Sequence, residues 1–369
     1  MKIAYDHQIF GWQAYGGISR YFYELANNIA KSGDSEVLVV SPLYVNFYLK
    51  ERVNSFRVIG RKVLAIRRSG RVYRAINQLF APKIMKSYVP DIVHETYYSN
   101  VSVAPKGCKV VVTVCDMVHE LYPESFSTWD STAREKAIAV ERADHIICIS
   151  ENTKSDLVKI LNVDPEKISV VHLGFSLTQE ARWKELGQAE TDTPYILYVG
   201  SRGGYKNFTN LLTAFAADRG LYGEFQLVAF GGGPFTAGER ILIAKLGLPL
   251  SRVRQLSGDD DMLADLYRGA AVFVYPSLYE GFGIPPLEAM SFDCPVACSN
   301  SSSIPEVVGD AALLFDPNSV QAITNALNDL INNIVLRDTL VARGRERIKL
   351  FSWSRCSEQT LKVYNALLK

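Results

Sequence analysis

Short apolar runs recur along this chain of 369 residues, each followed by a longer stretch in which apolar residues repeat at the helical period. The runs are rich in Val and Ile without clean alternation, which is typical of parallel strands buried on both faces. This strand–helix order indicates an α/β fold with parallel sheets. We expect strands over Lys2–Tyr5, Glu36–Ser41, Asp91–His94, Lys109–Val114, His145–Ser150 and Ile168–His172, and over Tyr195–Val199, Gln226–Phe230, Val253–Leu256, Ala271–Tyr275, Pro295–Ser299 and Ala312–Phe315.

A polar stretch over 176–194 separates these two sets of strands. A chain of this length exceeds the size at which one hydrophobic core usually keeps growing. We therefore expect a Rossmann-like domain over 1–175, a linker over 176–194 and a second Rossmann-like domain over 195–351. The remaining stretch, 352–369, is expected to form a helix that can cross back to the first domain.

The composition is that of a globular protein, with 48% hydrophobic and 21% charged residues. A net charge of +1 gives no reason to expect a nucleic-acid partner. Asp6 and His7 stand where a signal peptide would need its apolar stretch, and no run approaches 18 apolar residues. We expect a soluble cytoplasmic protein. One local basic cluster comprises Arg61, Lys62, Arg67, Arg68, Arg71 and Arg74.

The densest motif runs from Tyr275 to Met290, where a buried strand is followed by a Gly-rich turn and a helix that Pro285 and Pro286 open. Backbone N–H groups and the positive end of a helix dipole suit a phosphate. Ligands of open α/β sheets sit at the carboxyl ends of strands, where this turn falls. The turn residues predicted to contact a nucleotide are Gly281, Phe282, Gly283 and Ile284.

Two carboxylates, Glu280 and Glu288, bracket this turn with seven residues between them. Glu288 falls in the first helical turn, where it can accept hydrogen bonds from a ribose diol. The alternative is that it only complements the helix dipole, an effect of about 0.3–1 kcal/mol. The glycines of the same turn favour the ligand-binding interpretation.

The pair of Glu280 and Glu288, with seven residues between them, resembles the Glu-x7-Glu signature of retaining glycosyltransferases. The sequence that flanks this pair, together with Ser301–Val308, is similar to glycosyltransferase family 4. The resemblance covers nearly the whole chain and is strongest over Gly200–Lys206 and Gly258–Pro317. It implies a GT-B fold, two Rossmann-like domains with parallel sheets facing across a cleft, with 1–175 as the acceptor-side domain and 195–351 as the nucleotide-sugar-binding domain. It also implies that the first Glu lies by the transferred sugar and the second holds the donor ribose.

The resemblance has one departure just after the motif. Ser291–Pro295 stands where the family usually has a small residue and Gly before Pro-Val, which could alter the packing behind the motif.

A second constellation, Gly200–Lys206, is a Gly-rich loop between a strand and a helix start, and it carries Arg202 and Lys206. Cations beside backbone N–H groups suit a diphosphate whose charge grows as the glycosidic bond breaks. Lys206 matches the family spacing, whereas Ser201 stands at the family's Arg position and Arg202 is one residue further on. We assign the diphosphate role to both Arg202 and Lys206; the alternative is two solvated loop cations.

Three further loops follow strand ends. In the family, the first-domain loop that carries Gly16 and Gly17 faces the donor phosphates and the acceptor. Asp116 and His119 are candidates for orienting the acceptor or the sugar, because Cys115 stands where relatives often carry a His. His7, just past the first strand, has a similar position. For both histidines the alternative is a purely structural role. In the second domain, Gly231 is expected in a nucleoside-facing loop, with a plain turn as the alternative, and the backbone groups of Gln255–Leu256 are expected to pair with the base.

Asp259–Asp261 could suggest a metal site, but the surrounding sequence is typical of a helix cap with an acidic first turn. We expect neither a metal nor a cofactor.

The combined prediction is a metal-independent, retaining transferase that moves a hexose from a UDP- or GDP-sugar, such as UDP-glucose, to a glycan or lipid-linked acceptor. The resemblance suggests bacterial polysaccharide biosynthesis and a peripheral contact with the inner face of the cell membrane. The alternatives are a catalytically silent nucleotide-sugar-binding protein, an epimerase or a phosphorylase-like enzyme. The predicted catalytic residues are Asp116, His119, Arg202, Lys206 and Glu280.

Overall fold

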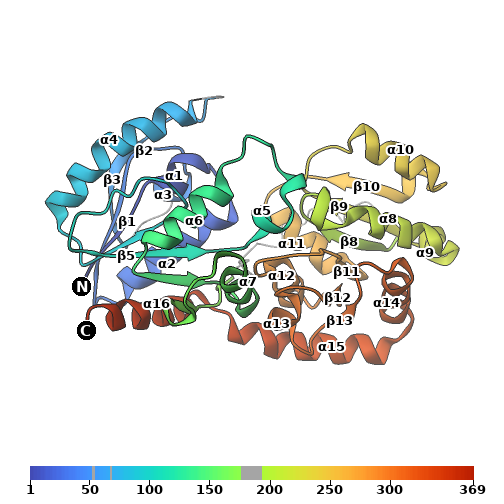
Figure 1. The fold of residues 1–369 in the computed structure, drawn as a ribbon. Coiled ribbons are helices and arrows are strands. Elements are labelled where there is room, and N and C mark those ends of the chain that lie inside the picture. Colours follow the sequence, from blue (N-terminus) through green and yellow to red (C-terminus); the bar gives the residue numbers. More distant parts are fainter. Residues whose placement is uncertain (52–54, 67–68, 176–192) are drawn as a thin grey trace. The chain divides into compact units, whose positions relative to one another are not determined.

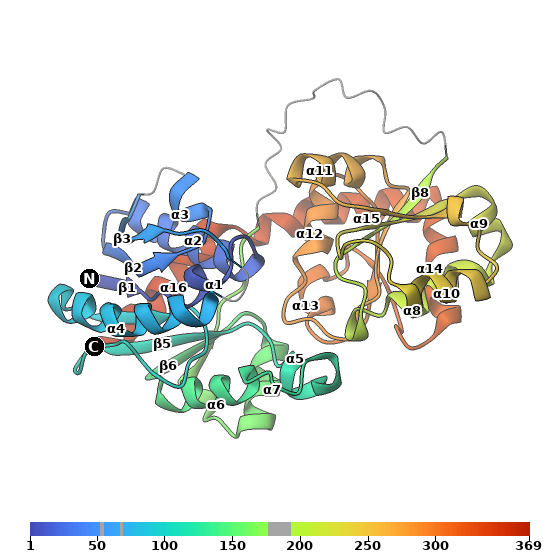
Figure 2. The same ribbon diagram turned by 90° about the horizontal axis from the view of Figure 1, so that it is seen from above.

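The computed structural model describes residues 1–51, 55–66, 69–175 and 193–369. The expected linker therefore lies almost entirely outside the described residues, as do Arg67 and Arg68. The chain divides into two compact units (Figures 1 and 2), one formed by Met1–Gly174 with Phe351–Lys369 and the other by Phe175–Leu350. Each is an α/β unit around a parallel sheet, as the sequence predicts.

The sheet of the first unit has seven parallel strands in the order β3-β2-β1-β4-β5-β6-β7. Its centre is a Rossmann-type order, in which the chain leaves β1 toward one edge and returns to the other side at β4. The six strands predicted in this half are all present. The strands are β1 (Lys2–Tyr5), β2 (Glu36–Tyr44), β3 (Arg57–Lys62), β4 (Ile92–Glu95), β5 (Lys109–Val114), β6 (His145–Cys148) and β7 (Ile168–Val170).

The sequence did not predict β3, which forms the edge of the sheet. None of its six residues is fully buried, and half of them are basic. An edge strand of this kind lacks the apolar run that reveals a central strand, and its charges discourage edge-to-edge pairing with another chain. Arg61 and Lys62, expected in a basic cluster, are part of this edge.

The helices of the first unit include the C-terminal one. Helix α16 packs on α2, so the last residues of the chain belong to the unit that contains its first (Figure 1). Close packing requires Gly174, where a Cβ atom would lie 2.3 Å from the Trp353 nitrogen. These helices are α1 (Gln8–Trp12), α2 (Gly17–Lys31), α3 (Tyr48–Glu51), α4 (Gly70–Tyr88), α5 (Val118–Leu121), α6 (Thr132–Arg142), α7 (Glu151–Leu161) and α16 (Trp353–Leu367), with 3-10 turns at Pro123–Ser125 and Pro165–Lys167.

A buried histidine ties α16 to the sheet. His94 at the end of β4 is fully buried, with Nδ1 2.5 Å from the Tyr364 hydroxyl of α16 and Nε2 2.8 Å from Thr113 Oγ1 of β5. Burial lowers the pKa of His94 to about 3, so the ring is neutral in the folded protein at neutral pH. The sequence placed His94 in a strand and gave it no role.

The second unit has a six-stranded parallel sheet in the order β10-β9-β8-β11-β12-β13, which is again a Rossmann-type order. The strands are β8 (Tyr195–Val199), β9 (Gln226–Phe230), β10 (Val253–Leu256), β11 (Val272–Tyr275), β12 (Val296–Ser299) and β13 (Leu313–Phe315). The helices are α8 (Phe208–Ala217), α9 (Arg219–Glu224), α10 (Ala237–Lys245), α11 (Asp260–Gly269), α12 (Ile284–Ser291), α13 (Ile304–Val308), α14 (Val320–Asn332) and α15 (Ile334–Arg347), with 3-10 turns at Gly204–Lys206, Leu250–Arg252 and Ile348–Leu350.

The difference between this sequence and the usual family sequence just after α12 has a structural basis. Asp293, two residues before Pro295, has a φ of 59°, the left-handed conformation that usually favours glycine. Asp tolerates this conformation better than most residues. Its carboxylate also receives two hydrogen bonds from Arg345 of α15, at 2.7 and 2.9 Å. The two hydrogen bonds from Arg345 stabilise a turn that glycine would adopt without a side-chain contact.

Within the described ranges, no helix combines the length and the apolar character that crossing a lipid bilayer requires.

Candidate active site

The second unit carries most of the predicted site residues on loops that follow β8 and β11. These strands are neighbours at the centre of the sheet, where the strand order reverses. Open α/β sheets bind ligands at such a reversal, beyond the carboxyl ends of the strands. The loops are joined by a hydrogen bond from Leu278 N to Tyr205 O, at 2.8 Å. Asn207 ties the first loop to the second by donating to Pro276 O at 3.0 Å.

Lys206 and Glu280, which the sequence placed in separate motifs, meet at this reversal. Lys206 Nζ lies 2.7 Å from Glu280 Oε1 and 2.9 Å from Oε2. The side chains are 18% and 11% exposed, so the ion pair is largely withdrawn from water. Burial and the adjacent Glu280 raise the pKa of Tyr275 well above its usual value, so this neighbouring hydroxyl is protonated. The strand ends of the second unit thus carry a preformed pair of one cation and one carboxylate.

The turn between Glu280 and α12 is held by two serines. Ser302 Oγ accepts a hydrogen bond from Glu280 N at 2.9 Å, and Ser303 Oγ donates to Glu280 O and Phe282 O at 2.8 and 2.9 Å. The turn ends at Gly283, whose φ of 101° suits glycine. The sequence named Gly281, Phe282, Gly283 and Ile284 as ligand contacts but assigned no role to Ser302 or Ser303, although both lie in the Ser301–Val308 text.

Glu288 lies in the second turn of α12 and not in the first turn as predicted, because the helix begins at Ile284; it is partly buried, and Tyr267 of α11 orients it. The Tyr267 hydroxyl donates to Glu288 Oε2 at 3.2 Å. Tyr267 is fully buried, and burial followed by the charge of Glu288 raises its pKa well above the usual value, which keeps the hydroxyl a donor. Here it fixes the second carboxylate of the motif.

Arg202 takes a position that differs from the predicted one. Its guanidinium donates to Gly231 O at 2.8 Å, to Gly233 O at 2.9 Å and to Glu239 Oε1 at 2.7 Å, and its side chain is only 3% exposed. It also lies over the ring of Phe235, at 4.9 Å. Most of its donors are therefore used to brace the loop after β9. This geometry favours a positioning role over direct contact with a diphosphate, because few donors remain.

Gly231 opens a run of three glycines with left-handed backbone, at φ values of 92°, 68° and 69°. The run is packed against the β8 loop, since a Cβ at Gly232 would lie 2.8 Å from Arg202 Nη1 and 3.2 Å from Gly200 O. The left-handed backbone of these residues favours glycine, and Gly231 lies beside the β8 loop, where a Cβ would be 3.5 Å from Gly200 O. Its contact with a nucleoside stays a prediction.

Of the backbone groups of Leu256, which the sequence predicts to pair with the base, the carbonyl oxygen is already engaged within the protein. It accepts hydrogen bonds from Gly231 N at 2.9 Å and from Gln255 Nε2 at 2.7 Å. A carbonyl oxygen has two lone pairs, so both are used within the protein. In this conformation the oxygen cannot pair with a base.

In the first unit, Gly16 and Gly17 begin α2, and the side chain of Gln13 covers its first turn. Gln13 Oε1 accepts a hydrogen bond from Ser19 N at 3.2 Å. A Cβ at Gly16 would lie 2.4 Å from that oxygen, whereas Gly17 borders open space. The close contact at Gly16 involves the movable end of the Gln13 side chain, so it accounts for glycine there only while Gln13 covers the first turn. Only Gly17 keeps the open approach that the prediction requires.

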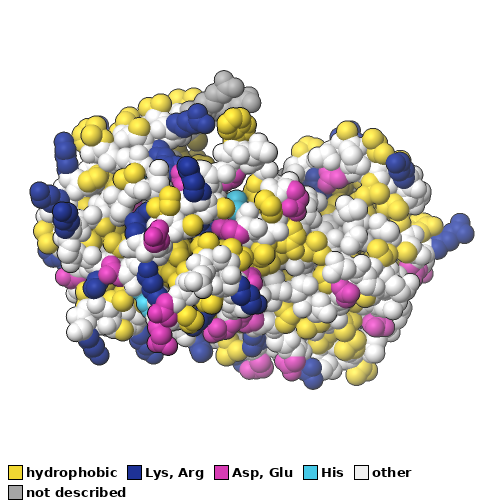
Figure 3. Space-filling view, in the orientation of Figure 1, with side chains coloured by type: hydrophobic (Ala, Val, Ile, Leu, Met, Phe, Trp, Pro, Cys, Tyr) yellow, Lys and Arg dark blue, Asp and Glu magenta, His cyan; other side chains and the backbone are white. Residues whose placement is uncertain are grey.

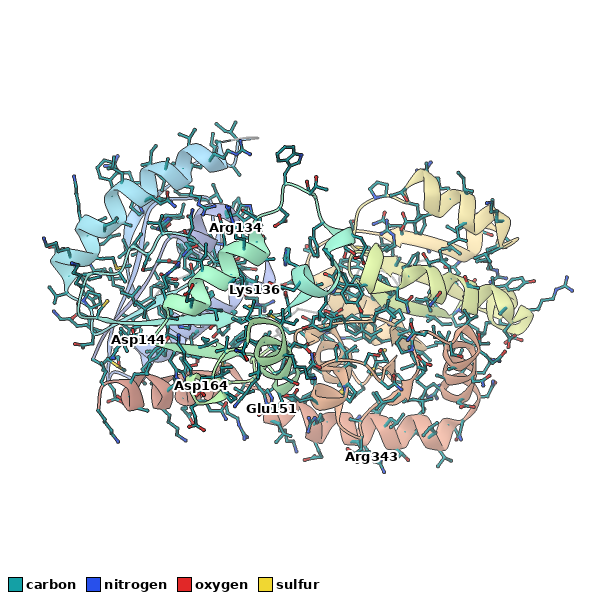
Figure 4. All side chains as sticks on the ribbon, in the orientation of Figure 1. Arg134, Lys136, Asp144, Glu151, Asp164 and Arg343 are labelled. Atoms are coloured by element: carbon teal, nitrogen blue, oxygen red, sulfur yellow. The ribbon has the colours of Figure 1, made fainter. Side chains whose placement is uncertain are left out.

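Asp116 is close to a buried lysine that the sequence missed. Lys136 of α6, labelled in Figure 4, is fully buried; it donates to Asp116 O and Glu120 Oε2, both at 2.8 Å. Its Nζ lies 3.9 Å from Asp116 Oδ1. On the same helix Arg134 is exposed. A buried cation requires such partners. The sequence around Lys136 shows only a helical pattern, which does not reveal which residues these partners are.

His119 lies in α5 with its ring stacked on Phe126, at a centroid distance of 3.9 Å. Its Nε2 is 3.9 Å from Asp130 Oδ2, and its buried Nδ1 finds no hydrogen-bond partner among the described residues. Burial, assisted by Lys136, lowers the pKa of His119, which favours a neutral ring. The neighbouring Cys115 is also unreactive, since burial raises its pKa to about 12.

The acidic run at Asp259 forms a helix cap, as its sequence suggests. Asp259 Oδ1 accepts a hydrogen bond from Met262 N at 3.0 Å at the start of α11. Among the residues that the structure describes, no group of three or more His, Cys, Asp or Glu side chains is arranged to hold a metal ion.

Two family models match successive parts of the chain. The one described as glycosyltransferase family 4 matches residues 15–179, and the one described as glycosyl transferases group 1 matches residues 179–347. Together they cover both units.

Similarities to individual proteins are consistent with these two family matches. O-antigen chain mannosyltransferase B of Escherichia coli is 32% identical over 242 residues, with 62% of each chain covered, so less than two thirds of that relative's length is matched. Sucrose-phosphate synthase of Thermosynechococcus elongatus has a TM-score of 0.77 at 22% identity, covering 99% of this chain and 98% of the other. Anabaena Alr3699/HepE in complex with UDP and glucose has a TM-score of 0.72 at 18% identity, covering 99% and 100%.

The two Rossmann-type units, with a paired carboxylate and lysine at the strand ends of the second, define a GT-B fold of the glycosyltransferase class. The chain belongs to glycosyltransferase family 4, as the Glu280–Glu288 motif predicted.

Proposed function

We propose that this protein transfers a hexose from a nucleoside-diphosphate sugar to a glycan or lipid-linked acceptor, with retention of anomeric configuration. The observation that carries the proposal is the Lys206–Glu280 pair, at 2.7 Å, beside the Tyr267-oriented Glu288. The three groups come from loops and a helix that surround the reversal of strand order. They supply one cation for phosphate and two carboxylates for hydroxyl groups.

In this proposal the donor ribose hydrogen-bonds to Glu288, and the diphosphate lies against the turn over 281–284. Lys206 turns from Glu280 to the diphosphate, so that Glu280 is left to accept hydrogen bonds from the sugar. The bond between the anomeric carbon and the diphosphate oxygen breaks with its electron pair on the oxygen. The acceptor hydroxyl forms its bond to the same face of the sugar, and its proton passes to the departing oxygen.

Lys206 is proposed to stabilise the charge of the leaving group without a metal ion. An interaction that strengthens as charge develops accelerates the reaction more than it tightens binding. The proposed role of Arg202 is indirect, to keep the loop after β9 in place beside the diphosphate.

The relatives suggest the sugar. The mannosyltransferase relative favours a mannosyl donor, and hence GDP as the first nucleotide to examine; the structural neighbour that holds UDP and glucose makes UDP-glucose the second. By the same reasoning the acceptor belongs to polysaccharide assembly. The proposal places the enzyme in the cytoplasm, where it would meet its nucleotide-sugar donor and its acceptor.

A peripheral membrane contact is part of the proposal for the first unit. Hydrophobic side chains at Leu64, Val72 and Leu79 are 79%, 57% and 61% exposed, on and before α4. Figure 3 shows basic and hydrophobic side chains intermixed over the part of the first unit where α4 lies, and Lys83 and Lys86 of α4 are exposed. Apolar groups with nearby cations suit an anionic lipid surface.

The test is the release of nucleoside diphosphate from a panel of GDP- and UDP-hexoses, with and without an α-linked mannobiose acceptor and with excess EDTA. The proposal expects release that depends on acceptor and survives EDTA, and a product with the donor's anomeric configuration by NMR. Absence of release with every donor would indicate a silent binding protein. Loss in EDTA, restored by magnesium or manganese, would contradict the role of Lys206.

A further inference from the structure

Lys136 of α6 is a buried cation beside the loop after β5, residues 115–117. Its side chain is 0% exposed, and its Nζ donates hydrogen bonds to Asp116 O and to Glu120 Oε2, both at 2.8 Å. The ammonium also lies 4.0 Å from Met117 Sδ and 5.4 Å from the centre of the Tyr98 ring. One nitrogen therefore connects α6 with the loop after β5, with α5 and with the segment that follows β4.

The donors of this ammonium are all directed at the protein. A lysine has three N–H donors, and here two reach full acceptors while the sulfur of Met117 and the face of Tyr98 lie close by. Hydrogen bonds from a charged donor are shorter and stronger than those between neutral groups. We therefore expect Lys136 to restrict the movement of the loop more than an apolar side chain would.

Stability alone is a weak reason for an ion pair in this place. The counter-ion, Glu120, is also withdrawn from water, with a side chain that is 9% exposed. Removing two charges from water costs free energy that their attraction often only offsets, so well-packed apolar side chains can replace such a pair without loss of stability. An apolar pair could not hold a peptide carbonyl in one orientation. The buried Lys136–Glu120 pair therefore favours a positioning role.

Asp116 is the polar residue that this arrangement orients. Its carbonyl oxygen accepts the hydrogen bond from Lys136, and its Oδ1 lies 3.9 Å from the same nitrogen. Oδ1 also accepts a hydrogen bond from Val118 N at 3.1 Å, at the start of α5. The backbone and the carboxylate of Asp116 are thus both held. The side chain is nevertheless 33% exposed, so it is accessible from solvent.

Tyr98 fixes the same loop from the neighbouring strand. Its hydroxyl accepts a hydrogen bond from Cys115 N at 3.3 Å, and its ring lies beside Lys136. Burial raises the pKa of Tyr98 well above its usual value, so the hydroxyl stays protonated. Because β4 and β5 are neighbours in the sheet, the loop is held both from α6 and from the segment after β4.

We propose that Lys136 is a positioning residue of the transfer reaction, which acts through Asp116 by fixing the loop after β5 and the direction of the Asp116 carboxylate. The inference rests on the proposed transferase function. Glu120 serves as the counter-ion that keeps the lysine in place. Lys136 itself makes no contact with a substrate in this proposal.

The experiment is a cycle of variants of the full-length protein. Lys136→Met alone would leave Glu120 buried and unpaired, so Glu120→Gln and Lys136→Met are combined in a double variant with side chains of similar size. We expect kcat/KM for the acceptor to fall about ten- to a hundredfold, because a misplacement of about 1 Å can cost about a hundredfold in rate. Nucleoside-diphosphate affinity should not change. Lys154→Met, which removes a partly buried lysine of α7 that donates to Ile168 O at 3.3 Å, is the matched control.

A role that operates through Asp116 predicts that the losses do not add. Asp116→Asn should lower the same kcat/KM. The double substitution should then cause no further loss in the Asp116→Asn background, because both changes remove one connected set of contacts. A pair that serves only stability would reduce activity independently of Asp116.

The charge of Lys136 can also be followed without any activity, through the ring of His119. The charged groups that face this ring are Lys136 of α6, Asp116 of the loop after β5, Glu120 of α5 and Asp130 of the segment before α6. Burial and then Lys136 lower the pKa of His119, whereas the three carboxylates raise it, Glu120 least. NMR titration should therefore show a higher His119 pKa in the double variant and a lower one in Glu120→Gln than in the wild type.

The outcomes separate this inference from the proposed function. A wild type that releases no nucleoside diphosphate from any donor contradicts the transferase function. If the wild type is active, additive losses, or wild-type kinetics in the double variant, overturn the role of Lys136 and leave the transferase function supported. An unchanged His119 titration in the double variant would also overturn it, because the ammonium would then not lie beside the loop.

Discussion

The two units share the Rossmann-type strand order but differ in the titratable groups near their strand ends. In the second unit the charged residues at the strand ends are bound to each other, as in the pairs Lys206–Glu280 and Arg202–Glu239. In the first unit, buried nitrogens of His7 and His119 have no hydrogen-bond partner in the described part of the chain. Both units contain ion pairs and buried polar atoms without a partner among the described residues, the latter including Gln226 Oε1 and Ser277 Oγ in the second unit. What distinguishes the second unit is that a cation and a carboxylate meet on the loops at the reversal of its strand order.

The largest expected effect concerns turnover in the second unit. Lys206→Ala removes the cation proposed to stabilise the leaving group, so we expect kcat to fall roughly ten- to a thousandfold. Steady-state kinetics with saturating donor measures this, and Lys245→Ala, an exposed lysine of α10, is the control. Unchanged kcat in Lys206→Ala would mean that the paired charges serve stability alone.

Arg202→Ala should affect the same unit in a different way. The substitution leaves three partners of a buried guanidinium unsatisfied, so we expect the free energy of unfolding to fall by about 3 kcal/mol. Chemical denaturation measures it, with the exposed Arg240→Ala as control. If stability is unchanged and kcat collapses, Arg202 contacts the diphosphate, as its sequence position predicted.

Acid should distinguish the units, because all five histidines lie in the first. The pKa of His94 is about 3 in the folded state and about 6.5 unfolded, so its contribution is complete above pH 6.5 and is lost as the pH falls. We expect His94 to lower the free energy of unfolding by about 2 kcal/mol between pH 7 and pH 5. In His94→Gln this pH dependence should shrink. An equal slope in both proteins would contradict the buried neutral ring.

The smallest effect tests the orientation of Glu288. Tyr267→Phe deletes one hydrogen bond, and we expect nucleoside diphosphate to bind about 1 kcal/mol more weakly. Tyr195→Phe also removes a buried hydroxyl of this unit, one that donates to Leu266 O at 2.8 Å, and should change stability without changing affinity. Equal affinity losses in both variants would point to a general loosening.

The sequence predicted the fold well because buried parallel strands carry continuous apolar runs. It missed only the exposed edge strand β3 among those described. At the site it identified Glu280 and Glu288 as one motif, because their spacing is local. The roles of Arg202 and Leu256 depend on which backbone groups the fold brings near them, and no local pattern reveals that. Lys136 and His94 escaped notice for the same reason, because their partners lie far away in sequence.

The most direct test of the central claim is calorimetric titration of GDP and UDP into the wild type and Glu288→Ala. If Glu288 holds the donor ribose, the variant should keep its fold and bind the preferred nucleotide about 1.5–3 kcal/mol more weakly, the contribution of a charged hydrogen bond. Identical titration curves for the two proteins would show that the nucleotide lies elsewhere and would contradict the donor site described for the second unit.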